Sequence, residues 1–154
     1  MIKVEKVLIP VDGSDSSKNA ARYAAHLINA KNPKLYLLHV SDPISVTIGG
    51  KKGEELRQEA HAKSMELLEE YRKILEPCKM DVELVARSGR PDYVILNMQE
   101  ELDCDLIVIG SRGLSVLENV IMGSVVTRVL EGATCPVLVT RNLRKKYLQG
   151  ACGL

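Results

Sequence analysis

The residues best suited to bind a ligand lie between positions 110 and 124. Gly110 and Gly113 enclose two residues after an apolar run, and nine residues separate them from Gly123-Ser124. Glycine has no side chain, so both positions let a ligand approach the main chain closely. Gly123-Ser124 is expected to open a helix, whose N-terminal N–H groups and positive dipole end favour phosphate. The spacing therefore predicts a phosphate site.

Polar side chains within the same segment fit that chemistry. Arg112 can add a charge-assisted contact, and the hydroxyls of Ser111 and Ser124 can bond phosphate oxygens or a Mg²⁺-bound water. Taken alone, however, the glycines are equally compatible with a purely structural role in shaping turns. The segment is neither a P-loop nor a dinucleotide fingerprint, because the chain contains no G-x-x-x-x-G-K-[ST] and no G-x-G-x-x-G after an apolar run.

Other chemistries find little support in the sequence. No Ser-His-Asp, paired-carboxylate or metal-ligand constellation stands out from local spacing. His39 lies at the end of an apolar run, where a packed, hydrogen-bonded role is favoured over catalysis. The four cysteines form no C-x-x-C pair, so neither a zinc knuckle nor a redox dithiol is indicated, and thiols in a reducing compartment are expected.

Short apolar runs alternate with helix-like segments along the chain. The runs are residues 7–11, 35–40, 82–86, 106–109 and 136–139, and helices are expected after residue 14, from Glu54 to Leu75, from Pro91, and from Gly123 to Leu130. This β-α-β-α-β-α-β-α-β order predicts a mainly parallel sheet with helices on both faces. Ligands bind such sheets beyond the carboxyl ends of the strands, where the strand order reverses. Residues 10–13, 40–42 and those after Ile109 are the places to look.

Length and composition bound the rest. The 154 residues are 45% hydrophobic and carry a formal charge of +1, which predicts one folded domain and excludes disorder. Aromatic residues make up 3%, so base-stacking platforms and binding to nucleic acid are not expected. No apolar run reaches the ~20 residues that span a bilayer, and the first residues are too charged for a signal peptide. We expect a cytoplasmic protein without membrane contact.

Several segments together resemble one family. The pattern G-2x-G-9x-G-S, the opening run Val7–Ser14 and the closing run Cys135–Val139 are similar to those of the universal stress proteins, in the subgroup that binds ATP. The resemblance covers residues 3–141. It implies a single-domain, Rossmann-like α/β fold with an open five-stranded sheet of order 3-2-1-4-5. It also implies a homodimer that pairs the fifth strands at Val137–Val139.

The resemblance further implies ATP, with Mg²⁺, between the first and fourth strands. By position, the adenine and ribose would meet Pro10, Val11 and Asp12, the base would border Val40, the ribose and α-phosphate would meet Gly110, Ser111, Arg112 and Gly113, and the outer phosphates would meet Gly123, Ser124 and Val125. Val126 stands where the family often has a second hydroxyl, which leaves one phosphate contact open.

Three functions follow as hypotheses. The first is an ATP-binding stress-response module that acts as a nucleotide-dependent dimer on an unknown protein partner. The second is a slow ATPase or nucleotidyl-transferring enzyme in the same cleft, although no water-activating base is evident. The third is a dimeric adaptor that works without nucleotide. The domain is expected to span residues 1–141, and the basic tail 142–154 is expected to be a frayed, solvated end.

Overall fold

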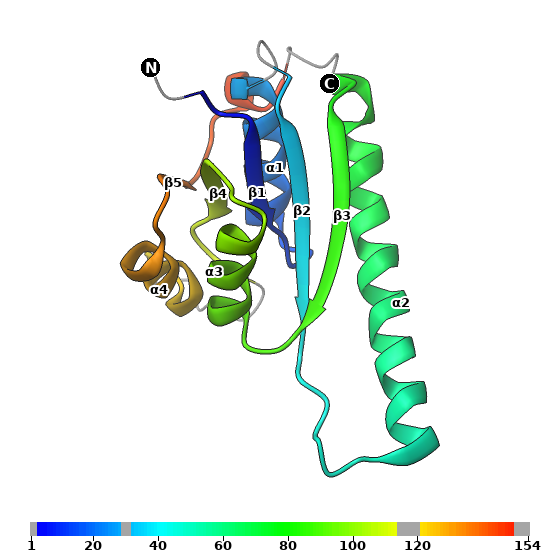
Figure 1. Ribbon diagram of the computed structural model, residues 1–154. Helices are drawn as coiled ribbons and strands as arrows, with labels where there is room; N and C mark the ends of the chain where they lie inside the picture. Colours follow the sequence, from blue (N-terminus) through cyan, green and yellow to red (C-terminus); the bar gives the residue numbers. More distant parts are fainter. Residues whose placement is uncertain (1–2, 29–31, 114–120, 150–154) are drawn as a thin grey trace.

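Five parallel strands form a single sheet in the computed structural model, which describes residues 3–28, 32–113 and 121–149 (Figure 1). The strands are β1 (Lys6–Pro10), β2 (Lys34–Ser41), β3 (Asp81–Ser88), β4 (Leu106–Gly110) and β5 (Val137–Thr140). They lie in the order β3-β2-β1-β4-β5, and every neighbouring pair is parallel. The predicted α/β fold and strand order are confirmed.

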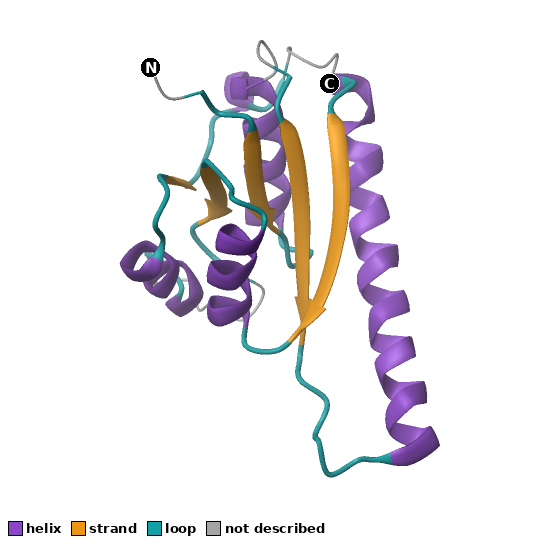
Figure 2. Cartoon of the chain, viewed as in Figure 1, coloured by secondary structure: helices purple, strands orange, loops and turns teal. Residues whose placement is uncertain are grey.

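Helices cover both faces of the sheet (Figure 2). They are α1 (Asp15–Ile28), α2 (Gly50–Leu75), α3 (Pro91–Glu101) and α4 (Ser124–Gly132). Buried residues of α1 and α2 pack with Val7, Ile9 and Val108 on one face, and those of α3 and α4 pack with Leu8 and Ile107 on the other. Because successive strand residues point to opposite faces, a wholly apolar strand fills both cores at once.

The helix α2 begins at Gly50, four residues before the predicted start at Glu54. Its first turn contains Gly53, a residue that on propensity alone argues against a helix. A Cβ on Gly53 would lie 2.2 Å from the carbonyl oxygen of Ile48, so the preceding loop closes directly over this position. Glycine is the residue that permits this close approach, because it has no side chain. The sequence pattern had predicted that Gly53 belongs to the loop.

Prolines mark two of the element ends that face the candidate site. Pro10 is the last residue of β1, and the amide of the next residue, Val11, donates to the carbonyl of Leu38. Pro91 occupies the first turn of α3, where its missing N–H removes no helical bond. The helix α4 continues to Gly132, two residues beyond the predicted Leu130.

Residues 145–147 of the C-terminal tail are folded, which differs from the frayed, solvated end expected. Lys145–Tyr147 form a short 3-10 turn, and the ring of Tyr147 packs edge-on against Tyr23 of α1 at 6.2 Å between centroids. Residues 150–154 lie outside the described part of the chain. The tail is therefore folded onto α1 through an aromatic contact that local sequence could not indicate.

Two further expectations can be compared with the fold. Cys104 and Cys135 are thiols, whereas the expectation of a thiol is wrong for Cys78, which is disulfide-bonded. Among the residues that the structure describes, no helix is both long enough and apolar enough to cross a membrane.

Candidate functional site

A cavity of about 240 Å³ opens at the carboxyl edge of the sheet, between the ends of β1 and β4. The strand order reverses between β1 and β4, and this place is the switch point of the sheet. The chain continues from β1 to α1 on one face and from β4 to α4 on the other face, so a gap is left between the ends of the two strands. The lining residues are Pro10, Val11, Asp12, Ser17, Leu38, Val40, Pro91, Ile95, Ile109, Gly110, Arg112, Gly113, Gly123, Ser124, Val125 and Val126.

Every residue predicted for the site lines this cavity except Ser111. That residue is 4% exposed and lies on the side of a neighbouring hollow. Its amide donates to the carbonyl of Thr140, and its carbonyl accepts from the amide of Gly123 at 2.9 Å. Ser111 thus ties the end of β4 to β5 and to the start of α4.

Sequence reasoning missed several residues of the lining: Ser17, Leu38, Pro91, Ile95 and Ile109. Val126, which the resemblance placed beside the phosphates, also lines the cavity. Leu38 and Ile109 were recognised only as buried strand residues. Pro91 and Ile95 reach the cavity because α3 starts at the same edge of the sheet, directly after β3. That placement was available from topology, since the carboxyl ends of parallel strands share one edge, but no local motif pointed to it.

The start of α4 faces the cavity with its first backbone amides. The first bond within the helix runs from the amide of Thr127 to the carbonyl of Gly123 at 3.1 Å, so the amides of residues 124–126 have no partner within their own helix. Gly123 is the N-cap and offers no side chain to bond them. The hydroxyl of Thr127 is turned back to the carbonyl of Gly123 at 3.1 Å. Amides that have no partner within their own helix are suited to an anion.

Two glycines of the motif make close contacts that explain their residue type. A Cβ on Gly113 would lie 2.8 Å from Oδ2 of Asp12, so the loop after β4 closes against that carboxylate. A Cβ on Gly110 would lie 2.5 Å from Oγ of Ser16, where β4 meets α1. One glycine therefore shapes the cavity, and the other packs the sheet against a helix.

A buried serine of α2 contacts β2 close to the cavity. Ser64 is 1% exposed, and its Oγ lies 2.7 Å from Nδ1 of His39, the residue before Val40 of the lining. Burial lowers the pKa of His39, opposed by the charges of Asp12 and Asp42. The ring of His39 is hydrogen-bonded, as expected from the sequence.

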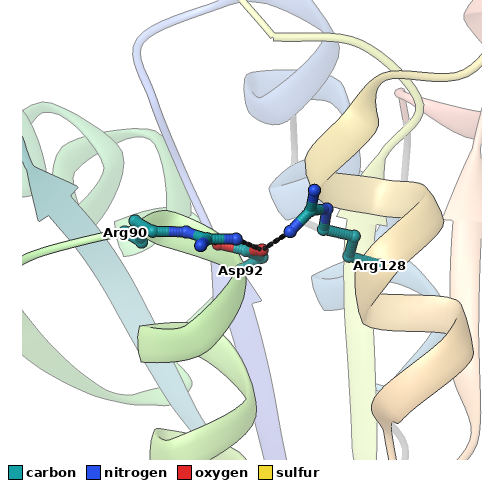
Figure 3. A network of polar contacts seen from close by, with 3 residues as sticks. All are labelled: Arg90, Asp92 and Arg128. Carbon is teal, nitrogen blue, oxygen red and sulfur yellow. Dashed lines mark hydrogen bonds and ion pairs between the residues drawn. The ribbon is translucent and has the colours of Figure 1, made fainter.

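An ion-pair cluster joins the two helices on the other face (Figure 3). Oδ2 of Asp92 in α3 accepts from Arg90 at 2.8 Å and from Arg128 in α4 at 3.1 Å. The carboxylate is 10% exposed, and the guanidinium of Arg90 holds its pKa below the usual range. Since α3 and α4 both line the cavity, this cluster links two of its walls.

The described residues hold no cluster of metal-ligating side chains. Across residues 3–28, 32–113 and 121–149, no three His, Cys, Asp or Glu side chains come together as a group that could hold a metal ion. The residues between Gly113 and Ile121 that complete the motif loop, 114–120, lie outside the described residues.

A doubly wound parallel sheet with a ligand-sized cavity at its switch point defines a class of α/β binding proteins. Residues 3–141 match the universal stress protein family model, and the chain belongs to that family. The chain is 34% identical over 145 residues to the universal stress protein YxiE of Bacillus subtilis, with 88% of this chain and 98% of that protein covered.

Solved structures have the same fold, and some of them contain a bound ligand. The hypothetical protein MJ0577 superposes with a TM-score of 0.83 at 26% identity, covering 93% of this chain and 99% of that chain. A universal stress protein in complex with cAMP gives 0.70 at 25% identity, with 91% and 98% covered. A family member from Arabidopsis thaliana with AMP bound gives 0.67 at 25%, with 92% and 94% covered.

Proposed function

We propose that this protein binds ATP with Mg²⁺ in the switch-point cavity and acts as a nucleotide-dependent regulatory dimer. The observation that carries the proposal is the convergence of both halves of the glycine motif with the end of β1 around one cavity. Gly110 and Gly113 are separated from Gly123 in the sequence, and a merely structural use of these glycines would not require them to share a cavity.

The chemistry of the lining suits an adenine nucleotide from end to end. Apolar side chains such as Val11, Leu38 and Ile109 offer a surface for the base. The carboxylate of Asp12 can accept hydrogen bonds from ribose hydroxyls. The amides at the start of α4 can donate hydrogen bonds to phosphates, and the guanidinium of Arg112 can offset part of their charge. Mg²⁺ would bind together with the phosphates, and the hydroxyl of Ser124 lies in the same lining, where it can bond a water of the ion.

The relatives support an adenine nucleotide as the ligand class. Two of the similar structures hold adenine nucleotides, one cAMP and the other AMP, and both match nearly the full length of this chain. Buried Val126 faces the cavity in place of the second hydroxyl, so the outer phosphates meet one polar side chain fewer. We therefore expect ATP and AMP to differ less in affinity than the motif alone implies.

Binding rather than turnover is the function that the cavity favours. Asp12 is the one carboxylate among the described lining residues, and no histidine is among them. A residue that holds the ribose is poorly placed to activate a water for attack on the outer phosphate. A slow ATPase would need a base from elsewhere in the chain.

Dimerisation is proposed through the edge strand β5. The amide of Ile107 donates to the carbonyl of Pro136, and the amide of Ser111 donates to the carbonyl of Thr140. The backbone N–H and C=O groups of the even-numbered residues of β5 therefore point toward β4. Backbone groups alternate in direction along a strand, so those of Val137 and Val139 point to the open edge. An apolar edge of this kind is suited to pairing with a second copy.

A thermal-shift experiment tests the nucleotide proposal. Nucleotide-stripped protein is heated with ATP-Mg²⁺, AMP, cAMP or GTP. Ligand at ~100 times its dissociation constant stabilises the native state by ~2.7 kcal/mol, which raises Tm by roughly 5–10 °C for a domain of this size. A shift with adenine nucleotides and not with GTP supports the proposal. No shift with any adenine nucleotide overturns it and favours the adaptor.

A further inference from the structure

We propose that Tyr71 of α2 is a positioning residue for the nucleotide site: its hydroxyl holds the turn after β1 so that Asp12 is presented to the cavity. This inference rests on the proposed function and adds a residue from outside the motif. Tyr71 lies far along the chain from the turn, is 0% exposed and does not line the cavity itself.

The hydroxyl of Tyr71 joins two residues of that turn. The amide of Gly13 donates to Oη of Tyr71 at 3.0 Å, and the same oxygen lies 2.5 Å from Oγ of Ser17. Gly13 has a φ of +87°, a left-handed conformation that favours glycine. The tyrosine therefore bonds the one residue of the turn whose backbone conformation is most unusual.

The donors and acceptors can be assigned along the whole chain of bonds. The Ser17 hydroxyl donates to the carbonyl of Ser14 at 3.0 Å, which uses its single proton. The proton between Ser17 and Tyr71 must then come from the tyrosine. The bonds run in one direction, from the Gly13 amide to Tyr71, to Ser17 and to the Ser14 carbonyl, an arrangement in which each bond polarises the next.

This chain of bonds surrounds Asp12. The amide of Asp12 approaches Oγ of Ser17 at 3.4 Å, and its Oδ1 accepts from the amide of Ser14 at 3.0 Å. Gly13 and Ser14 thus fix the residue that carries the carboxylate, and Tyr71 fixes Gly13 and Ser17. Burial raises the pKa of the Tyr71 hydroxyl, so it keeps the proton that the chain of bonds needs.

The test replaces Tyr71 with phenylalanine, which keeps the ring and removes the oxygen. We expect calorimetry to give a dissociation constant for ATP-Mg²⁺ that is roughly 3- to 10-fold larger than that of the wild type. This is the range that the loss of one hydrogen bond produces. The amide of Gly13 should also exchange faster with solvent in the ligand-free protein.

Tyr36→Phe is the matched control. Tyr36 lies in β2, is 7% exposed, and is absent from the cavity lining, so its hydroxyl can be removed without touching the turn. The control should bind ATP as the wild type does and leave the exchange of Gly13 unchanged. Comparing Tm for the two variants separates a loss of affinity from a general loss of stability.

A double variant separates positioning from packing. If Tyr71 acts through Asp12, the affinity loss caused by Tyr71→Phe should disappear in an Asp12→Asn background. Equal losses in both backgrounds, or an unchanged affinity of Tyr71→Phe, would overturn the positioning role while leaving the proposed function standing. Failure of the wild type to bind any adenine nucleotide would overturn both.

Discussion

At the scale of single residues, the two glycines after β4 have different tasks. A Cβ on Gly113 would meet the carboxylate of Asp12 at 2.8 Å, and the far end of a side chain can move away. We predict that Gly113→Ala displaces this carboxylate and weakens adenine-nucleotide binding by about tenfold, the cost of one hydrogen bond to a charged group. Calorimetric titration measures the loss, and the unfolding free energy should change by less than about 0.5 kcal/mol.

Gly110 is the contrasting case. A Cβ there would lie 2.8 Å from the backbone carbon of Ser16 and 2.5 Å from its Oγ, and the backbone of α1 cannot yield as a side chain can. We predict that Gly110→Ala lowers the unfolding free energy by about 1–3 kcal/mol, the usual cost of overpacking. Urea unfolding measures it. Equal stability of the two alanine variants would contradict this division of roles.

At the scale of elements, the Asp92 cluster governs how α3 meets α4. Asp92→Asn keeps the shape of the side chain and removes the charge that both arginines bond. At pH 7 we expect the unfolding free energy to fall by about 1 kcal/mol, between the values for exposed and buried charged pairs. Glu59→Gln, which breaks an exposed pair with Lys63, should have no measurable effect.

The same variant has a defined dependence on pH. The pKa of Asp92 is lowered in the folded protein, so its charge stabilises the fold above the unfolded-state value of about 4. That contribution is lost as the pH falls further, through the folded pKa. Unfolding curves for the wild type and Asp92→Asn should therefore converge below about pH 4. A difference that persists at lower pH would mean that the carboxylate acts through packing alone.

At the scale of the whole molecule, the open edge of β5 is the surface on which the proposed dimer depends. Val139→Pro removes a backbone donor that points away from β4, and proline is tolerated at an edge strand. We predict that this variant is a monomer by light scattering, whereas Val139→Thr, which keeps the donor, stays dimeric. A monomeric wild type would refute the edge-strand interface.

The sequence predicted the overall architecture better than it predicted the ends of individual elements. Alternating apolar and amphipathic segments were enough to predict the parallel sheet, because a strand buried on both faces must be apolar throughout and a covering helix must be so on one side. The boundaries were less accurate, as at Gly53, where a close backbone contact places a glycine inside a helix.

The sequence by itself predicted which residues of the motif line the cavity, Ser111 excepted, since the glycine spacing and the strand ends depend only on local chain geometry. The tertiary structure alone decided three contacts. The amide of Ser111 bonds to β5, Pro91 and Ile95 complete the cavity lining, and the hydroxyl of Tyr71 supports the turn after β1. These contacts join residues far apart in the sequence, and hydrogen bonds over such separations leave no periodicity or spacing by which a single chain reveals them.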